Sequence, residues 1–304
     1  MNQCRNCGGS KLQELGPIGQ VQPFFLKRVF GMKVRVPRSP NPVKQAIRNF
    51  AGLLMSFYPR LFRQFAYVEM QLCTSCFFIQ TKIPFRNEDI AQLYCDYRSP
   101  SYNQERISYE PEYADIAQVI GQVESEVSTR RSALTLFLSK VLQTSEADTL
   151  LDYGGSDGRF IPDIPGTRFV YEISSMVPIP GVTRIQSESE LGEYSLVLFA
   201  HVLEHVTHPL EMVRKLRNYV KAGGYLYIET PQDLSDEQRT GLQRASSRLD
   251  IGIHEHINNY CAPAVVALLE SAGFTVAAIE TEAVDVGWAK SVHIRALARK
   301  PMAS

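Results

Sequence analysis

The stretch TLLDYGGSDG, residues 149–158, decides the fold of this chain, together with FVYE at residues 169–172. A short apolar run ends in Asp152 and a glycine-rich turn, and a second apolar run ends in another acid, Glu172. In an open α/β sheet, the first strand delivers such a turn to a nucleotide, and the acid that closes the second strand accepts ribose hydroxyls. The pattern therefore predicts a nucleotide site at the ends of two neighbouring parallel strands.

The spacing of the glycines indicates which kind of nucleotide the site would bind. They fall at positions 154, 155 and 158, so the turn does not match the dinucleotide pattern G-x-G-x-x-G. Asp152 lies two residues before the first glycine and twenty residues before Glu172. An acid on the first strand suits a ligand with an amino-acid cation better than it suits a pyrophosphate. We therefore expect a nucleoside that carries an amino-acid group.

Two later segments continue the pattern in the same order along the chain. LVLFA at residues 196–200 has the composition of a buried strand, and HVLEHVTHPL follows at residues 201–210. VKAGGYLYIETP at residues 220–231 then predicts a turn and a further strand. The glycine-rich turn resembles motif I of the class I S-adenosylmethionine (SAM) methyltransferases. The later segments resemble that family's LEHV-x-x-P helix start and its L-K-P-G-G turn, with Ala222 in place of the proline, and the resemblance spans residues 149–300.

This resemblance implies an α/β fold of the Rossmann-like class I methyltransferase type, a seven-stranded sheet whose last strand is antiparallel. Carried over residue by residue, it implies a set of SAM-binding residues: Asp152, Gly154, Gly155, Ser156, Gly158, Glu172, Ile173, Ala200 and His201. Ser156 departs from the family pattern, because it stands where the middle glycine is expected. Prolines at positions 162, 165, 178 and 180 predict that the helices after the first two strands are short.

The bulk composition favours a cytoplasmic enzyme. The chain has 304 residues, with 32 Lys+Arg and 32 Asp+Glu, so no net charge points to nucleic acid. No secretory leader precedes Cys4, and no run of eighteen apolar residues is found. We expect a zinc-binding module at 1–100, a helical linker at 101–145 and a SAM-dependent methyltransferase domain at 146–304.

Four of the six cysteines form two C-x-x-C pairs, Cys4 with Cys7 and Cys73 with Cys76. Two residues between thiolates let both sulfurs reach one ion, and two such turns complete a tetrahedron. Gly8 and Gly9 suit a knuckle in which backbone amides turn back toward sulfur. A redox role is the competing interpretation, but no βαβ unit lies beside either pair. The spacing predicts one structural zinc ion.

The segment between the cysteine pairs is basic, with no acid from residue 15 to residue 68. Apolar residues recur at helical spacing from Val43 to Phe57 and predict an amphipathic helix at 43–65. Such a helix suits peripheral contact with the inner face of an anionic membrane, or a cover over a lipid-linked substrate. It equally suits RNA phosphates, or packing on the catalytic domain with a solvated basic face. These alternatives stay open.

Residues 111–143 predict a helix that links the two halves, with one apolar stripe from Ile116 to Val127. Just before it, four tyrosines cluster where we expect the entrance of the SAM site. They are Tyr94, Tyr97, Tyr102 and Tyr109. Aromatic side chains there would line the cleft, or would simply pack a surface linker.

The segment IHEH at residues 253–256 carries the candidate catalytic residues. It resembles the Y-H-E-H segment of the zinc-containing sugar C-methyltransferases, which also carry a cysteine-rich zinc domain ahead of the SAM domain. That resemblance implies that Glu255 and His256 serve acceptor binding and proton abstraction beside a keto group. It also places His205 in the active site. Ile253 stands in place of the family's tyrosine and removes a hydroxyl from the site.

An imidazole near its ordinary pKa accepts a proton at neutral pH, so we expect His256 to be the general base. His201, Glu204 and His205 also match the inverted zinc-protease pattern H-x-x-E-H, but that chemistry needs both histidines on one helix, and His201 ends a strand.

Three functions follow. The first is C-methylation of a small-molecule acceptor such as a nucleotide-linked or lipid-linked sugar. The others are an RNA methyltransferase with a zinc module and a non-catalytic SAM-binding scaffold, and we expect nucleic acid less than a small molecule.

Overall fold

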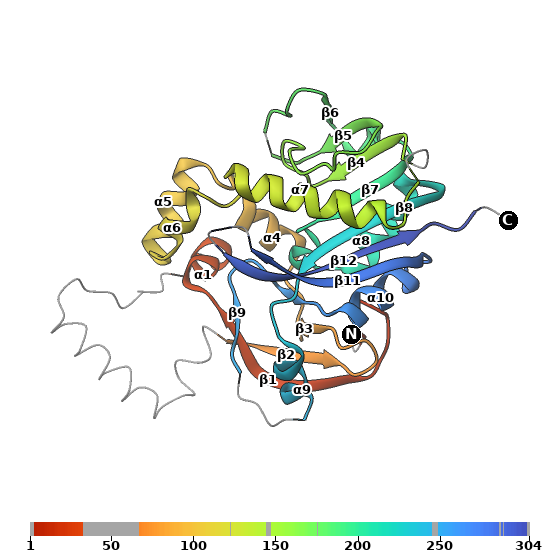
Figure 1. Cartoon of the computed structure of the whole chain (residues 1–304). Helices are drawn as coiled ribbons and strands as arrows, with labels where there is room; N and C mark the ends of the chain where they lie inside the picture. The colour runs from red at the N-terminus through yellow and green to blue at the C-terminus, as the bar shows by residue number, and fades with distance from the viewer. Residues whose placement is uncertain are drawn as a thin grey trace, which may run out of the picture.

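The computed structural model describes residues 3–32, 67–121, 123–143, 147–174, 176–244, 249–285, 287 and 289–302. The helix expected at 43–65 and most of the basic segment around it lie outside the described residues. The described part of the chain forms a large sheet and a smaller sheet beside it (Figure 1).

The large sheet has seven strands in the order β11-β12-β8-β7-β4-β5-β6. Strands β8, β7, β4, β5 and β6 run parallel, and β12 runs antiparallel to both of its neighbours. The predicted fold is therefore confirmed, including its antiparallel last strand. The strands of this sheet are β4 (Thr149–Tyr153), β5 (Thr167–Tyr171), β6 (Val182–Ile185), β7 (Tyr194–Ala200), β8 (Val220–Pro231), β11 (Thr275–Asp285) and β12 (Lys290–Arg299).

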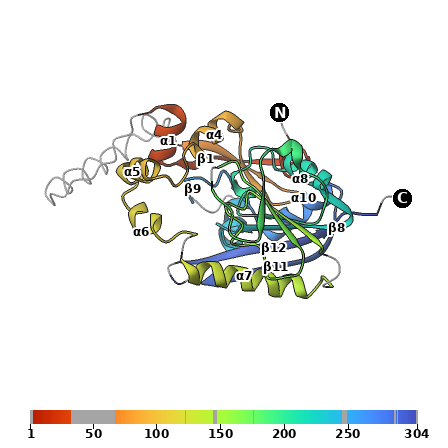
Figure 2. The ribbon, with the colours of Figure 1, turned by 90° about the horizontal axis from the view of Figure 1, so that it is seen from above.

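Helices cover both faces of this sheet. On one face, Leu134 and Phe137 of α7 (Glu124–Ser139) pack on buried residues of the strands. On the other face, α8 (Pro209–Leu216) and α10 (Ala262–Ser271) bury Val213 and Leu268. Figure 2 shows α7 on one side of β11 and β12, with α8 and α10 on the other. The ends of β4 and β7 therefore meet at one edge of a layered α/β core.

The connections after the first two strands contain no helix in their described residues. Residues 154–166 and the described part of 172–181 form turns and bends. The expectation of short helices is thus wrong, because the left-handed backbone at Gly154, Ser156 and Gly158 breaks the first connection and prolines interrupt both connections. The glycine-rich turn after β4 leads into a loop, and it does not open a helix.

The smaller sheet joins distant parts of the sequence. Its order is β10-β3-β2-β1-β9, and the five strands are β1 (Leu12–Val21), β2 (Tyr67–Cys73), β3 (Ile79–Thr81), β9 (Ile251–Ile253) and β10 (Asn258–Asn259). Figure 1 shows blue β9 beside red β1. Because β9 and β10 are the two outer strands, residues 254–257 connect opposite edges of the N-terminal sheet. The boundaries expected at 100 and 145 stay predictions.

The helix expected at 111–143 is interrupted. It is divided into α6 (Tyr113–Ala117) and α7, and Gly121 takes a left-handed φ of 67° between them. The expectation of a single stripe from Ile116 to Val127 is therefore wrong, and the residues of α7 that pack on the sheet are Leu134, Phe137 and Leu138. The remaining helices are α1 (Pro23–Phe30), α4 (Asn87–Tyr94), α5 (Pro100–Tyr109) and α9 (Asp236–Gln243), with short 3-10 turns η1 (Glu188–Glu190), η2 (Leu203–His205) and η3 (Arg217–Tyr219).

Among the residues that the structure describes, no helix combines the length and the apolar character needed to cross a bilayer.

Candidate active site

The glycine-rich turn folds tightly against the end of β4. Gly154, Ser156 and Gly158 have left-handed φ values of 78°, 56° and 81°. A Cβ atom on Gly155 would lie 2.1 Å from the carboxylate of Asp152, so only glycine fits there. Ser156, which replaces the family glycine, adopts the left-handed conformation despite its side chain. The turn thus keeps the backbone close to Asp152, as the sequence predicts.

Asp152 lines a small cavity that is partly open to solvent. The cavity has a volume of about 10 Å³ and is also lined by Arg130, Phe160, Ala200 and Glu229. None of the described residues donates a hydrogen bond to Asp152, although the residue is only 4% exposed. Burial raises its pKa to about 7, against the attraction of Arg130. A buried carboxylate without a hydrogen-bond donor is a place where a ligand cation would be stabilised.

Arg130 is the positive charge on the far side of this cavity. It comes from α7, and its guanidinium lies over the ring of Phe160 at 4.2 Å. The cavity holds about one water molecule, so an amino-acid group can enter only when Arg130 or the turn moves. Asp152 and Arg130 together offer one charge of each sign to a zwitterion.

Glu172, just after β5, is hydrogen-bonded to the turn that follows β4. Its carboxylate accepts hydrogen bonds from the backbone N–H of Ser156 at 3.0 Å and of Ser174 at 2.8 Å. Glu172 is half-buried, and each of its oxygens has capacity for a further hydrogen bond. Its neighbour Ile173 is 83% exposed. The structure therefore brings Glu172 to the turn that follows Asp152, and Ile173 stands at the surface beside it.

The three candidate catalytic residues come together from two distant segments. His205 lies on η2 after β7, and Glu255 and His256 lie between β9 and β10. The rings of His205 and His256 are edge to face, with centroids 5.1 Å apart. Nδ1 of His205 lies 2.7 Å from the hydroxyl of Tyr94 and 3.0 Å from the backbone carbonyl of Glu255.

His256 is paired with an acid that the sequence analysis missed. Its Nδ1 lies 2.9 Å from Oδ2 of Asp233, in the loop after β8. Burial would lower the pKa of His256, but Asp233 outweighs it and raises the pKa to about 9. The expectation of a near-ordinary pKa was therefore wrong. Burial lowers the pKa of His205, so the two neighbouring rings differ in protonation at neutral pH.

Glu255 faces away from His256, toward α5. Its carboxylate forms an ion pair with Arg106 and accepts hydrogen bonds from the hydroxyls of Tyr97 and Tyr102 at 3.4 Å each. Burial opposes ionisation, but the charge of Arg106 outweighs it and lowers the pKa of Glu255. Three of the four predicted tyrosines, counting Tyr94, thus surround the candidate catalytic residues.

His201 lies against residues of β8 and β12. Its Nε2 lies 3.2 Å from Oε1 of Glu229, and Nδ1 of His293 lies 2.7 Å from the same oxygen. The hydroxyl of Tyr227 donates to the other oxygen of Glu229 at 2.5 Å. His201 ends a strand with a left-handed φ of 55°, so it does not share a helix with His205. This excludes the inverted-protease arrangement.

A comparison with protein families decides the assignment. The family model described as a methyltransferase domain matches residues 123–279, a little over half of the chain. The chain belongs to the methyltransferase-domain family. It is a SAM-dependent methyltransferase, and the strand order and the glycine-rich turn are those of class I. No curated protein matches the sequence.

Solved methyltransferase structures resemble this methyltransferase only distantly. The 1,6-didemethyltoxoflavin-N1-methyltransferase of Burkholderia thailandensis is 13% identical, over 76% of this chain and 96% of its own, with a TM-score of 0.45. The N-methyltransferase NodS of Bradyrhizobium japonicum is 15% identical, over 60% and 99%, with a TM-score of 0.39. Human N-acetylserotonin methyltransferase is 18% identical, over 69% and 59%, with a TM-score of 0.40. These likenesses leave the acceptor of the methyltransferase open.

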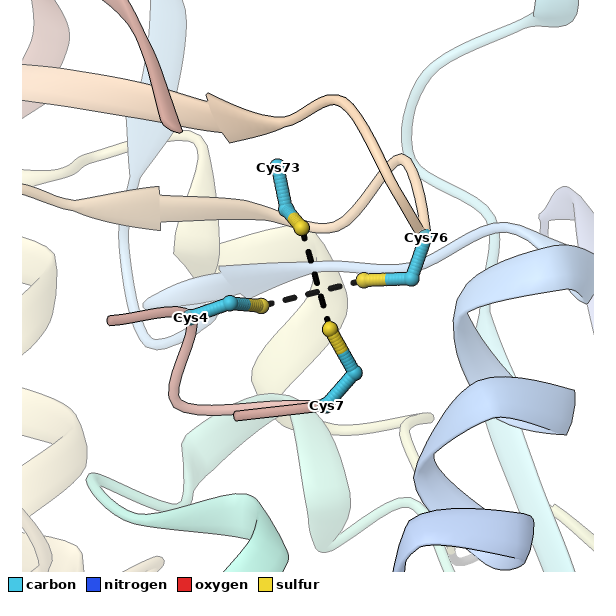
Figure 3. A group of neighbouring side chains, drawn as sticks. All are labelled: Cys4, Cys7, Cys73 and Cys76. Atoms are coloured by element: carbon cyan, nitrogen blue, oxygen red, sulfur yellow. Dashed lines mark hydrogen bonds between the residues drawn. The ribbon is translucent and has the colours of Figure 1, made fainter. Parts of the chain in front are cut away.

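The four predicted zinc ligands of the methyltransferase converge on one point, as Figure 3 shows. The Sγ atoms of Cys4 and Cys76 are 3.7 Å apart, and so are those of Cys7 and Cys73. A disulfide would bring them to about 2.05 Å, whereas a tetrahedral ion with Zn–S bonds of about 2.3 Å separates its sulfurs by about 3.8 Å. The thiols therefore have the spacing of zinc ligands.

The two cysteine turns have matching backbones. The residue after each second cysteine has a left-handed φ, 75° for Gly8 and 63° for Phe77. The first turn also docks on the methyltransferase core, because Nδ2 of Asn6 donates to the carbonyl of Ala264 in α10 at 2.8 Å. Cys4, Cys73 and Cys76 belong to the same buried cluster as α8 and α10. The cysteine site and the large sheet thus share one core.

Three residues of the site, Asp233, Arg106 and Arg130, gave no signal in the sequence. Asp233 and Arg106 are single charges outside any motif, and Arg130 is one of several polar residues on α7. Tyr94 was noted, but its partner His205 lies 111 residues away. Ile253, which replaces the family's tyrosine, is fully buried in the core of the smaller sheet. Its side chain therefore fills that core and does not contribute to the polar site.

Proposed function

We propose that this SAM-dependent methyltransferase methylates a carbon atom of a sugar or related small molecule that carries a keto group. The observation that carries the proposal is the convergence of His205, Glu255 and His256 with three tyrosine hydroxyls. Hydroxyls, imidazoles and a carboxylate in a half-buried site suit an acceptor with several oxygen atoms. The resemblance to the sugar C-methyltransferases favours a sugar acceptor, which we propose is nucleotide-linked or lipid-linked.

SAM binding is assigned to the ends of β4, β5 and β7. Asp152 takes the ammonium of the amino-acid group, and Arg130 takes its carboxylate when the cavity opens. Glu172 accepts hydrogen bonds from the ribose hydroxyls. The turn of Gly154, Gly155, Ser156 and Gly158 lets the backbone approach the ligand closely. The contacts of the nucleoside with Ile173, Ala200 and His201 follow from the resemblance. Support comes from the buried carboxylate of Asp152, which has no donor among the described residues.

The transfer is an in-line displacement at the methyl carbon. A general base removes the proton beside the keto group, and the electron pair left on carbon forms the new C–C bond. The bond between methyl carbon and sulfur breaks, and its electron pair stays on sulfur as a neutral thioether. We assign His256 as the candidate general base, His205 as its assistant and Glu255 as the residue that positions the acceptor. Because Asp233 raises the pKa of His256 to about 9, the deprotonated ring that this role needs is the minor form at neutral pH, and turnover should rise as the pH approaches 9.

Zinc is assigned a structural role. Cys4, Cys7, Cys73 and Cys76 would hold one ion with four thiolates, which leaves no open position for a substrate. The ion would fix the N-terminal turns against α10, and so would support the smaller sheet that carries residues 254–257. Contact of residues 43–65 with a membrane surface stays a proposal, to be tested by salt-dependent sedimentation with anionic vesicles.

One experiment tests the substrate class. The full chain is incubated with SAM labelled in the methyl group and with three acceptors in parallel. These are a nucleotide-linked deoxysugar with a keto group, the same sugar with the ketone reduced to a hydroxyl, and total RNA. We expect the label on a carbon of the keto sugar alone, located by mass spectrometry and NMR. Label on RNA alone, or equal label on both sugars, would overturn the proposal.

A further inference from the structure

We propose that Glu204, His205 and His256 form a binding site for a divalent transition-metal ion, separate from the four-cysteine site. One carboxylate oxygen of Glu204 and one ring nitrogen of each histidine lie within 4.8 Å of one another. Ligands of an ion with metal–nitrogen and metal–oxygen bonds of about 2.1 Å lie 3 to 4 Å apart, so a small inward movement completes the site. The three residues come from η2 and from the link between β9 and β10.

The first argument is an orphaned oxygen on Glu204. The residue is 1% exposed, and its Oε2 accepts a hydrogen bond from Oγ1 of Thr230 at 3.1 Å. Its Oε1 is buried and has no hydrogen-bond partner among the described residues. The nearest ring nitrogens are Nδ1 of His201 at 3.5 Å and Nε2 of His205 at 3.8 Å. These contacts are longer than hydrogen bonds, so the oxygen is only partly compensated, and a cation placed before it would stabilise it further.

The second argument is the way the two rings are held. Nδ1 of His205 is engaged by the carbonyl of Glu255 and the hydroxyl of Tyr94, and Nδ1 of His256 is engaged by Asp233. Metal-binding histidines are typically fixed in this way, with one ring nitrogen donating to a carbonyl or carboxylate. An ion would then bind at the other nitrogen, Nε2, and would displace any proton carried there. Both rings therefore present Nε2 as the atom for an ion.

A second group of metal-ligand type is less suited. His201, Glu229 and His293 also lie within reach of one another. However, both oxygens of Glu229 are already occupied, one by the two histidines and the other by Tyr227. That group is satisfied by internal hydrogen bonds. The orphaned oxygen of Glu204 distinguishes the proposed site from it.

The donor set indicates the class of ion. Two imidazoles and one carboxylate favour Zn²⁺, Fe²⁺, Mn²⁺ or Co²⁺ over Mg²⁺ and Ca²⁺, which prefer oxygen ligands alone. Three protein ligands leave open positions, and an oxygen of the acceptor, a keto or hydroxyl oxygen, would take one of them. An ion there would lower the pKa of the bound hydroxyl, or of the carbon next to the bound ketone. This role rests on the proposed function for the position of the acceptor, and it replaces the proton-accepting role of His256, because a ring bound to an ion at Nε2 and to Asp233 at Nδ1 has no nitrogen left to accept a proton. The metal site itself does not rest on the proposed function.

Titration with Co²⁺ tests the site on the full-length protein after all bound metal, including that at the four thiolates, is removed with a chelator under reducing conditions. Cobalt at the four thiolates gives an intense sulfur-to-metal charge-transfer band, and cobalt at Glu204, His205 and His256 gives only weak d–d bands. We expect two equivalents in the wild type. Glu204→Gln keeps the shape of the side chain and its contact with Thr230, and should lose the second equivalent alone. Asp233→Asn should weaken that equivalent roughly tenfold to a hundredfold.

Matched controls separate the two sites. His254→Ala removes a neighbouring imidazole whose side chain is 49% exposed, and should keep both equivalents. Cys76→Ser should lose the charge-transfer band and keep the second equivalent. If Glu204→Gln fails to fold by circular dichroism, His256→Ala, at a half-exposed position, answers the same question. A single equivalent in the wild type, or a second equivalent that survives in Glu204→Gln and His256→Ala, would overturn the site.

Methyl transfer to the keto sugar separates this proposal from the proposed function. Enzyme that holds only the thiolate-bound ion should lose most of its turnover and regain it with added Mn²⁺ or Zn²⁺. Full turnover without the second ion would overturn the metal's role and leave the C-methylation proposal standing. Two bound equivalents without any transfer to the sugar would overturn the C-methylation proposal and leave the metal site standing.

Discussion

The carboxylate of Asp233 lies 2.9 Å from Nδ1 of His256, although the two residues are 23 positions apart and belong to no common motif. Asp233 follows the end of β8, which belongs to the large sheet, whereas His256 lies between two strands of the smaller sheet. The pair thus forms at the junction of the two sheets. The pair fixes the orientation of the His256 ring, which we propose acts on the acceptor. Glu255 does not take part in this pair and binds Arg106 instead.

His256→Ala should lower turnover on the true acceptor by roughly a hundredfold or more, because the proton-transfer or metal-ligand role of the ring is lost. SAM affinity should not change, because Asp152 and Glu172 lie on other strands. Turnover assays combined with calorimetry check both parts. His254→Ala is the control and should retain turnover. Near-normal turnover in His256→Ala would remove this residue from the mechanism.

SAM affinity should rise with pH as Asp152 ionises. Its pKa is raised to about 7 by burial, with Glu172 and Asp157 adding to the effect and Arg130 opposing it. The ammonium of the ligand needs the ionised form, so the affinity should be roughly five to ten times weaker at pH 6 than at pH 7.5. Calorimetry at both pH values tests this, with Asp152→Asn as the control. That variant should bind weakly and equally at both values, and a wild type without pH dependence would contradict the assignment.

The same group predicts how the ligand-free protein responds to pH. The folded-state pKa of Asp152 lies above its unfolded value, so the folded state binds more protons between about pH 4 and pH 7. The stability that this group contributes is therefore present at low pH and is lost as pH rises through about 7. Asp152→Asn should remove this loss and raise the free energy of unfolding at pH 8 by roughly 2–4 kcal/mol. Urea denaturation at pH 6 and pH 8 measures it, and an equal or lower stability of the variant at pH 8 would be evidence against a buried carboxylate.

Cys76→Ser should abolish tight zinc binding and destabilise the protein, since thiolate ligation couples the ion to folding. The effect should reach the large sheet, because Cys76 shares a buried cluster with α8 and α10. Metal analysis under reducing conditions and thermal unfolding test this. Cys95→Ser changes an exposed thiol and should alter neither quantity. Wild-type protein without zinc would refute the metal assignment.

Arg106→Met should lower the free energy of unfolding by about 3–5 kcal/mol, because it leaves the buried carboxylates of Glu255 and Glu110 without their cation. Adding Glu255→Gln should recover part of this loss, since one of the two uncompensated charges is then removed. Urea denaturation of the single and double variants tests the coupling. Additive losses would mean that the ion pair contributes nothing beyond its separate residues.

Much of the large sheet could be predicted from the sequence. Its buried parallel strands appear as short apolar runs, and the turn after β4 needs glycine or a left-handed residue at fixed places, so both leave a local signal. The four cysteines were predictable for the same reason, since C-x-x-C is itself a local geometry. The candidate site was predictable in part, because His205, Glu255 and His256 lie in segments that resemble family motifs. Helices were predicted less well where prolines and Gly121 interrupted the periodic pattern.

What the sequence by itself determined is the set of elements and the ligand types, because propensity, glycine turns and metal spacing act within a few residues. Only the tertiary structure decided which of them meet. Strands β9 and β10 are three and two residues long. They pair with N-terminal strands 232 residues earlier, for β9, and 178 to 180 residues earlier, for β10, a register that no local pattern encodes. That pairing carries Glu255 to Arg106 and His256 to Asp233. Charges and imidazoles on separate strands interact through space at a few ångströms, so their partners and protonation follow from packing.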